Sequence, residues 1–357
     1  MIIRKLQLTG FRNLADLTLC PCEGVNVIYG ENAQGKTNLL ESIWLFSGMK
    51  SFRGAKDSEL VGFGKPFARM EMDFFSAQRE QKAVLTVENS RKATLNGVSL
   101  SSAAKLMGKC HAAVFSPAFL SLVQAGPSER RRFLDMALCQ MKPSYAQALR
   151  IYNRALRQRN TLLGDLYAHP ELEALLEVWD ARLCEAGEEI LQAREEYLTF
   201  LQPTAEQVYD GLSSSREKLN LVYIKKDNAQ AEKSLAQLLN EHRREDIINK
   251  TTSVGPHRDD MGIFINGAAA RTYGSQGQQR SCAIALKLSE AQILKEITGE
   301  QPVILLDDVM SELDAGRQDY ILNHIGDRQV FITCCDPASI LRLCNGKTFE
   351  IANGKII

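Results

Sequence analysis

One stretch decides the fold of this chain: Gly30-Glu31-Asn32-Ala33-Gln34-Gly35-Lys36-Thr37. It fits the pattern G-x-x-x-x-G-K-[ST], it follows a predicted strand at Val25–Tyr29, and it opens a predicted helix at Asn38–Phe46. The glycines let backbone N–H groups curl around phosphate oxygens, and the helix N-terminus adds its positive end. Lys36 then reaches the β- and γ-phosphates, and Thr37 ligates magnesium. The stretch predicts a nucleotide site; a glycine-rich turn with a surface lysine is the alternative.

A second motif is acidic. The apolar run Val303–Leu306 predicts a buried strand, and Asp307 and Asp308 follow it directly. Such a pair suits ATP hydrolysis, because Asp307 can hold magnesium while Asp308 positions or deprotonates the attacking water. A core strand that ends in two solvated acids is the alternative, but the upstream phosphate-binding stretch favours the catalytic interpretation.

A third motif lies between these two: Tyr273-Gly274-Ser275-Gln276-Gly277-Gln278-Gln279-Arg280, followed by a helix-like run at Ser281–Lys295. Ser275 is a natural N-cap, so a hydroxyl and free backbone N–H groups would gather at a helix N-terminus and form a second anion site. A plain capped helix is the alternative. Because the chain has one phosphate loop, a separate receptor for a γ-phosphate indicates an ATP shared between two chains.

The composition is that of an ordinary globular protein, with 357 residues, 45% hydrophobic and 24% charged. No apolar run is long enough for a membrane span, and Met1–Leu6 alternates like a strand, unlike a signal peptide, so we expect a cytoplasmic protein with no membrane partner. Lys plus Arg equals Asp plus Glu, at 43 each, so DNA binding would need a local basic patch. The nine cysteines lack the spacing of a zinc framework, and we expect reduced, mostly buried thiols.

The chain divides into two α/β pieces that flank a helical insertion. Residues 1–125 are rich in predicted strands, with a hairpin signal at Asn96-Gly97, and residues 249–357 return to strands and helices, with a second signal at Asn266-Gly267. Residues 126–248 carry apolar positions at helical spacing. We expect a head built from 1–125 and 249–357, and an arm at 126–248.

Within the arm, one long amphipathic helix is predicted from Trp179 to Leu201, with a polar interruption at Arg194. Prolines at positions 143, 170 and 203 are expected to divide the arm into four or five helices.

In chain order, the serine-glycine motif, the acidic strand and Ser311-Glu312-Leu313-Asp314 resemble the signature, Walker B and D-loop motifs of ABC-type ATPase heads. Further stretches resemble the RecF family specifically: Leu8-Thr9-Gly10-Phe11-Arg12-Asn13-Leu14, Lys50-Ser51-Phe52-Arg53, Arg130-Arg131-Arg132-Phe133-Leu134-Asp135 and Ser253-Val254-Gly255-Pro256-His257-Arg258-Asp259-Asp260. The resemblance spans nearly the whole chain. It implies an α/β fold: an ABC-type ATPase head with two β-containing lobes, related to SMC heads, and an inserted α-helical arm domain.

The resemblance assigns roles to residues. It implies ATP and Mg²⁺ as cofactors, with Asp307 holding the metal through water and Asp308 acting as the catalytic base beside Lys36. Arg12 and Asn13 would lie beside the nucleotide. The phosphate-loop contacts would come from Gly30, Glu31, Asn32, Ala33, Gln34, Gly35, Lys36, Thr37 and Asn38.

A partner chain enters through the signature. By the same resemblance Ser275, Gly277 and Gln278 would reach across to the ATP of a second copy, and Asp314 would help join the two sites. ATP would then dimerise the head, and hydrolysis would release it. RecF proteins bind DNA at single-strand gaps and at double-strand to single-strand junctions, and they help the RecO and RecR mediators to load recombinase.

This chain departs from the wider ABC pattern at two positions. Asp308 stands where most transporters carry Glu, and its shorter reach to water predicts slow hydrolysis. Cys334-Cys335 stands where transporters carry a switch histidine. The equivalent of the Q-loop stays open between Ser116 and Gln124.

Basic residues give candidates for DNA contact: Arg130, Arg131, Arg132, Lys50, Arg53 and Lys56, with Lys225-Lys226 a weaker pair. Solvated faces are the alternative for each. His257-Arg258 fits a structural loop better than a nucleotide or DNA contact, and Trp44 fits core packing.

Two other functions compete with a DNA-clamping ATPase. One is the ATPase subunit of a transporter, against which the helical arm and the missing switch histidine count. The other is a nucleotide-binding structural module with negligible hydrolysis, against which both Asp307 and Asp308 count.

Overall fold

The computed structural model describes residues 1–226, 233–342 and 345–357, which form two compact units. Unit 1 comprises Met1–Ser121, Gly211–Ser215 and Arg280–Ile357, and unit 2 comprises Leu122–Asp210 and Arg216–Gln279. The mixed α/β class agrees with the sequence. Residues 249–279 cluster with unit 2, although the sequence placed them in the head, so the domain bounds stay a prediction.

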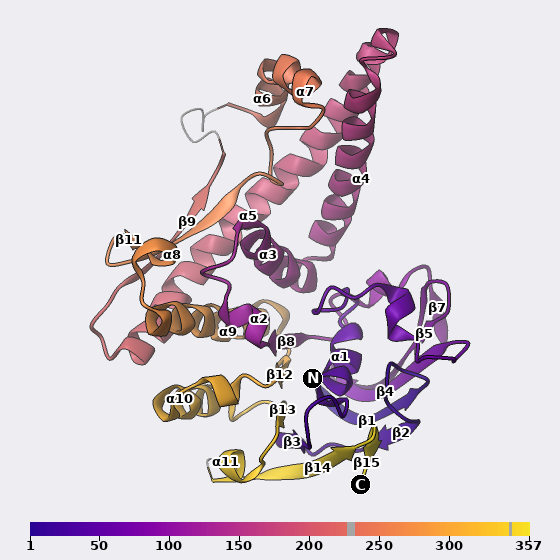
Figure 1. Ribbon diagram of the computed structural model, residues 1–357, viewed down its shortest axis with the longest axis vertical. Helices are drawn as coiled ribbons and strands as arrows, with labels where there is room; N and C mark the ends of the chain where they lie inside the picture. Colours follow the sequence, from indigo (N-terminus) through magenta and orange to yellow (C-terminus); the bar gives the residue numbers. More distant parts are fainter. Residues whose placement is uncertain (227–232, 343–344) are drawn as a thin grey trace. The chain divides into compact units, whose positions relative to one another are not determined.

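Unit 1 contains an antiparallel six-stranded sheet in the order β2-β1-β4-β5-β6-β7 (Figure 1). Its strands are β1 (Ile2–Thr9), β2 (Leu17–Leu19), β4 (Ala68–Ser76), β5 (Arg79–Val87), β6 (Arg91–Leu95) and β7 (Val98–Leu100). Every second residue of β4 is buried, so one face of the sheet packs into the core. Asn96 and Gly97 join β6 to β7 with φ of 51° and 80°, which confirms the predicted hairpin.

The second sheet of unit 1 has the order β15-β14-β3-β13-β12-β8, and all its strands except β15 run parallel. Its strands are β3 (Val25–Tyr29), β8 (Ala112–Phe115), β12 (Val303–Leu306), β13 (Val330–Cys334), β14 (Gly346–Ala352) and β15 (Lys355–Ile356). The helices of this unit are α1 (Lys36–Leu45), α2 (Pro117–Leu120), α10 (Ala315–Ile325), α11 (Ala338–Leu341) and most of α9 (Gln276–Thr298). The carboxyl ends of parallel strands meet at one edge, so the turns after β3, β13 and β12 gather there.

Unit 2 is mainly helical, and α4 and α5 lie side by side in Figure 1. Its helices are α3 (Pro127–Met141), α4 (Pro143–Asp165), α5 (Leu176–Ser213, mostly in this unit), α6 (Leu235–Glu241), α7 (Arg243–Asn249) and α8 (Ala270–Tyr273). A small sheet, β11-β10-β9, is formed by β9 (Leu219–Ile224), β10 (Asp260–Ile265) and β11 (Ala268–Ala269). Asn266 and Gly267 turn between β10 and β11 with φ of 49° and 81°, which confirms the second hairpin.

The expectation that Pro203 ends a helix is wrong. Pro203 lies inside α5, which continues to Ser213. A proline inside a helix costs about 3 kcal/mol or more. The apolar face of α5 is buried on both sides of the proline, through Leu198, Leu201 and Ala205, and this burial outweighs the lost backbone hydrogen bond.

The polar interruption of α5 is a buried ion pair. Arg194 is 2% exposed, and its Nη2 donates to Oδ1 of Asp135 on α3 at 2.8 Å. Its Nη1 donates to the carbonyl of Pro256 at 2.7 Å. Arg194 therefore joins α5, α3 and the loop before β10 inside unit 2.

Within the described residues, no helix combines the length and the apolar character needed to cross a membrane.

Candidate nucleotide site

The phosphate loop joins β3 to α1, and two of its glycines adopt backbone conformations in which a side chain would be strained. Gly30 has a φ of 147°, and a Cβ on it would lie 2.2 Å from the carbonyl oxygen of Ile351. Gly35 has a φ of 110°, and its Cβ would lie 2.4 Å from Cδ2 of Leu14. A side chain at either position would clash and would also strain the backbone. The predicted loop therefore has the tight curvature that its motif requires.

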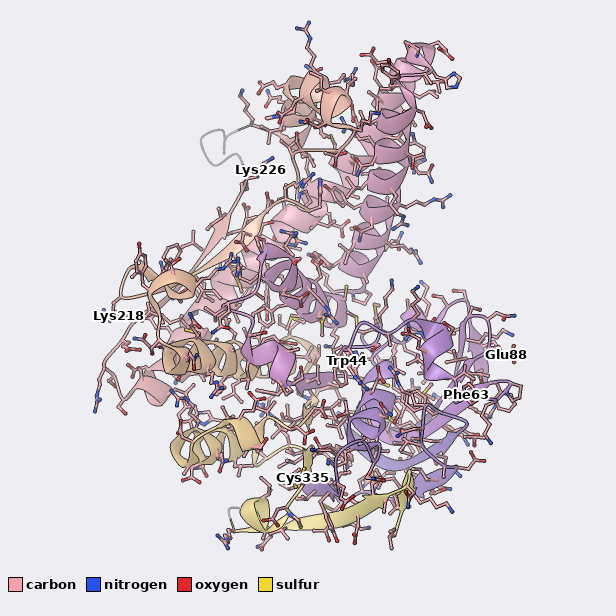
Figure 2. All side chains as sticks on the ribbon, in the orientation of Figure 1. Trp44, Phe63, Glu88, Lys218, Lys226 and Cys335 are labelled. Carbon is pink, nitrogen blue, oxygen red and sulfur yellow. The ribbon has the colours of Figure 1, made fainter. Side chains whose placement is uncertain are left out.

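Lys36 begins α1 and is 4% exposed. Its Nζ donates to the carbonyls of Gly30 at 2.6 Å and Glu31 at 2.9 Å, so the ammonium is held inside the curve of the loop. The same Nζ lies 3.7 Å from Sγ of Cys335, whose thiol donates to Oδ1 of Asn32 at 3.2 Å. Cys335, labelled in Figure 2, thus lies against the phosphate loop.

The residue that follows β12, Asp307, contacts the hydroxyl of Thr37 in the phosphate loop. Thr37 Oγ1 donates to Oδ1 of Asp307 at 2.8 Å, across 270 residues of sequence. Asp307 is 5% exposed, and burial raises the pKa of its carboxyl above the usual 3.8, although the hydrogen bond from Thr37 acts to lower that pKa. A buried carboxylate beside a hydroxyl is a set of hard oxygen ligands, and a divalent cation there would offset the cost of burial. The residues present therefore fit a Mg²⁺ site.

Thr333, at the end of β13, also belongs to this cluster and was not predicted. Its Oγ1 accepts from the backbone N–H of Asp308 at 2.8 Å and lies 3.2 Å from Oδ1 of Asp307. The sequence showed it only as the last residue of an apolar strand. Its hydroxyl fixes the turn in which Asp308 adopts a left-handed φ of 53°. The half-buried Asp308 side chain follows that turn, and its role as a base stays a prediction.

Arg12 and Asn13, both predicted to lie beside the nucleotide, make different contacts in the structure. Asn13 Nδ2 donates to the carbonyl of Ala33 at 3.1 Å, and its Oδ1 accepts from Asn38 at 2.6 Å, so Asn13 braces the phosphate loop. Arg12 instead donates from Nε and Nη2 to Glu41 of α1 at 2.6 and 2.9 Å. Its guanidinium is bound to a protein carboxylate, and Glu41, which the sequence did not indicate, is fully buried.

The signature motif begins α9 with a reciprocal capping arrangement in unit 2. The backbone N–H of Ser275 donates to Oε1 of Gln278 at 2.7 Å, and that of Gln278 donates to Oγ of Ser275 at 3.3 Å. The predicted N-cap is confirmed. Gln278 also donates from Nε2 to Glu217 at 2.7 Å. Gly277 lies between Ser275 and Gln278 in the sequence, in the first turn of α9. Ser275 is exposed.

The remaining ABC-type positions have local roles. Asp314 caps α10 by accepting from the N–H of Arg317 at 3.1 Å, and this hydrogen bond lowers the pKa of its carboxyl. Of the two Q-loop candidates, Gln124 donates to Gln279 Oε1 at 2.7 Å, while Ser116 precedes α2 as its N-cap residue without a side-chain cap. These contacts leave the choice open.

One of the six predicted DNA-contact residues is buried against the protein itself, contrary to that prediction. Arg130 is 5% exposed and makes a bidentate pair with Asp260, with both distances 2.7 Å. A guanidinium buried in this way does not present itself to a phosphate backbone, and Arg130 is therefore corrected to a structural residue of unit 2.

The other five candidates are more exposed than Arg130. Arg53 is exposed and donates to Asn38 Oδ1 at 2.8 Å. Lys50 and Lys56 are exposed in unit 1. Arg132 keeps 40% of its side chain exposed beside Glu129, and the half-buried Arg131 donates to the carbonyl of Asp259 at 2.7 Å.

His257 lies in a structural loop, as the favoured interpretation had it. Its Nδ1 accepts from Tyr152 Oη at 2.7 Å, and its Nε2 donates to the carbonyl of Thr252 at 3.1 Å. Burial lowers its pKa to about 4. Arg258 donates to the same carbonyl from Nη2 at 2.9 Å.

The fold and the cluster of Lys36, Thr37 and Asp307 define a phosphate-loop ATPase head of the ABC type. Known proteins agree: residues 2–343 match the family model described as the RecF/RecN/SMC N-terminal domain. The chain belongs to this family and, within it, to the RecF proteins.

The DNA replication and repair protein RecF of Agathobacter rectalis is 38% identical over 361 residues, covering 100% of this chain and 99% of that protein. The one from Clostridium perfringens is 37% identical over 362 residues, with 100% and 99% covered.

Solved structures give the same family. The recombination mediator protein RecF with ATP, in the RecFOR pathway, has a TM-score of 0.91 at 38% identity, covering 100% of this chain and 97% of that one. An Smc head domain from Pyrococcus furiosus has a TM-score of 0.56 at 15% identity, covering 100% and 96%, and shares the fold alone.

Proposed function

We propose that this chain is a cytoplasmic, ATP-dependent DNA-binding ATPase of recombinational repair. In this proposal ATP joins two copies, the dimer binds gapped DNA and junctions of double-stranded with single-stranded DNA, and it assists RecO and RecR in loading recombinase. Slow, DNA-stimulated hydrolysis then releases the complex. Membership of the RecF family supports the pathway.

The observation that carries the proposal is the hydrogen bond of 2.8 Å between Thr37 and Asp307. It joins the hydroxyl of the phosphate loop to the carboxylate of the acidic strand, which is the pair that a Mg²⁺–ATP site of this class needs. When bound, Mg²⁺ would neutralise charge on the β- and γ-phosphates between these two residues. A core without nucleotide chemistry would have no reason to bury a carboxylate against a hydroxyl at a glycine-rich loop.

The other residues act on the same nucleotide. Lys36 would exchange its two loop carbonyls for phosphate oxygens, and the backbone N–H groups of the loop would bind the remaining oxygens. Asp308 would orient and deprotonate the attacking water, and its short side chain suits slow turnover. Ser275, Gly277 and Gln278 of a second copy would then bind the γ-phosphate and make hydrolysis depend on dimerisation.

DNA would meet exposed cations outside the nucleotide site. Lys50, Arg53, Lys56 and Arg132 are the exposed candidates, with Arg131 partly covered. Contacts of this kind are with the phosphate backbone, so the proposed binding weakens as salt rises.

The test is sedimentation with Mg²⁺ and ATP, with and without gapped duplex DNA. We expect wild type to form a DNA-binding dimer only with ATP. Lys36→Arg and Ser275→Arg should each abolish the dimer, the first through the chain's own site and the second through the partner's. If wild type stays monomeric and ignores DNA under every condition, the proposed function is refuted, and the transporter and structural-module alternatives return.

A further inference from the structure

The signature loop is hydrogen-bonded to a carboxylate that no sequence motif contains. Glu217 Oε1 accepts from Gln278 Nε2 at 2.7 Å, and Glu217 Oε2 accepts from Tyr209 Oη at 2.5 Å. Tyr209 is fully buried near the end of α5. All three side chains belong to unit 2, so the contact links the long helix of the arm to the first turn of α9.

Glu217 is held in place by its chain neighbours as well. Lys218, labelled in Figure 2, donates its backbone N–H to Oδ1 of Asn266 at 2.8 Å. Its carbonyl accepts from the backbone N–H of Asn266 at 2.9 Å. The backbone N–H and carbonyl of Lys218 are thus both hydrogen-bonded to the β10–β11 turn. These bonds fix the backbone next to Glu217 and so restrict the position of its carboxylate.

This contact occupies the group that the partner's nucleotide would need. The amide of Gln278 has an oxygen that accepts and an NH2 group with two N–H donors: Oε1 accepts from Ser275 N–H at 2.7 Å, and one N–H of Nε2 donates to Glu217, which fixes the direction of the side chain. A γ-phosphate that approached would meet a side chain turned toward Glu217 and a negative charge behind it. Like charges within a few ångströms repel strongly where water is excluded.

We propose that Glu217 is a positioning residue that restrains the signature loop: it holds Gln278 away from the ATP of a second copy and thereby opposes association. The inference rests on the proposed shared ATP site. Association brings phosphate oxygens toward Gln278 against the negative charge of Glu217, and because Tyr209 holds the other carboxylate oxygen, the position of α5 sets how close that charge stays. The arm thereby regulates the ATP-bound dimer without touching the nucleotide.

The test is Glu217→Gln, which keeps the size and removes the charge. We expect its Mg²⁺–ATP-dependent dimer to be tighter than that of wild type by about tenfold or more. The affinity of the monomer for ATP should stay unchanged, since Glu217 does not touch the phosphate loop. The melting temperature should change little, since the Oε1 of glutamine can still accept from Tyr209. A merely structural role would move the melting temperature and not the dimer constant alone.

The matched control is Glu196→Gln. Glu196 lies on the same helix α5 and accepts from Gln192 Nε2 at 2.7 Å, far along the sequence from the signature. It should leave the dimer constant unchanged. Glu217→Asp, which keeps the charge, should also remain within about threefold of wild type.

Sedimentation at several protein concentrations gives the dimer dissociation constant of each variant with Mg²⁺ and ATP. A tighter dimer in Glu217→Gln alone supports the restraint, and so does a dimer that appears only in this variant. If wild type dimerises and Glu217→Gln is equal or weaker, the restraint is refuted while the proposed function stands. If neither dimerises with ATP, both fail.

Discussion

Replacing Glu41 by glutamine is expected to destabilise unit 1 more than any surface change. The Glu41 carboxylate is fully buried and accepts two hydrogen bonds from Arg12 and one from Ser51. The amide would turn a donor toward a donor and leave the Arg12 guanidinium without its counter-charge. Breaking a buried pair costs about 3–5 kcal/mol, and the 16% exposure of the Arg12 side chain argues for the lower end, about 3 kcal/mol.

The assay is urea unfolding followed by tryptophan fluorescence. The chain has two tryptophans, and in a Trp179→Phe background the buried Trp44 of α1 reports unit 1. At about 3 kcal/mol per molar urea, the midpoint should fall by about 1 M. Glu88→Gln is the control, because Glu88 is 48% exposed beside Lys92, and exposed pairs contribute about 0–1 kcal/mol (Figure 2).

A double-mutant cycle decides whether the pair itself matters. Arg12→Gln with Glu41→Gln should be less destabilised than the sum of the single variants by about 2 kcal/mol, because the second change removes the charge that the first left unpaired. Additive effects, or a midpoint shift in Glu41→Gln no larger than in Glu88→Gln, would refute the reasoning.

Three further predictions concern the site and the loop before β10. Asp308→Asn should slow ATP hydrolysis about 100- to 10,000-fold while ATP-dependent dimerisation persists, measured by phosphate release beside sedimentation; equal losses of both would contradict a role as base. Thr37→Val should weaken Mg²⁺-dependent ATP binding about 10- to 100-fold, measured by titration calorimetry with and without Mg²⁺. Thr348→Val, at an exposed threonine, is the control, and an equal loss of ATP affinity in the absence of Mg²⁺ would contradict a role of Thr37 as metal ligand. Because the pKa of His257 is lowered from 6.5 to about 4, the unfolded chain takes up a proton in that window and the folded one does not. Stability should therefore fall as pH drops from 6.5 to 4, and the slope should be smaller in His257→Gln; an unchanged slope would exclude His257 as the cause.

The parts of the fold that the sequence predicted are those whose signal is local. The apolar runs Val25–Tyr29 and Val303–Leu306 are strands with those bounds, because turn-forming or charged residues close each run. Both hairpins were predicted because left-handed backbone suits an asparagine followed by glycine. Pro203 misled the prediction because its effect on a helix is also local, while the burial that overrides it depends on the rest of unit 2.

The parts that the sequence did not predict depend on partners distant along the chain. Glu41 lies 29 residues from Arg12, so nothing nearby marks it as the counter-charge of an arginine expected at the nucleotide. Arg130 was taken for a DNA contact because three arginines in a row look exposed, but its partner Asp260 lies 130 residues away. The restraint on Gln278 by Glu217 likewise spans 61 residues.

Topology explains why the chemical departure at Cys335 leaves the geometry of the site intact. The strand order β3-β13-β12 puts β13 between the strand that carries the phosphate loop and the strand that carries the acids. Residues at the carboxyl end of β13 must therefore face both motifs, whatever their side chains. Thr333 does so at Asp307 and Asp308, and Cys335 does so at Lys36, 3.7 Å from its ammonium. A thiol there donates one hydrogen bond where an imidazole would present a ring nitrogen of adjustable charge. The fold thus places residue 335 beside the phosphate loop, and the sequence decides which side chain meets Lys36 there.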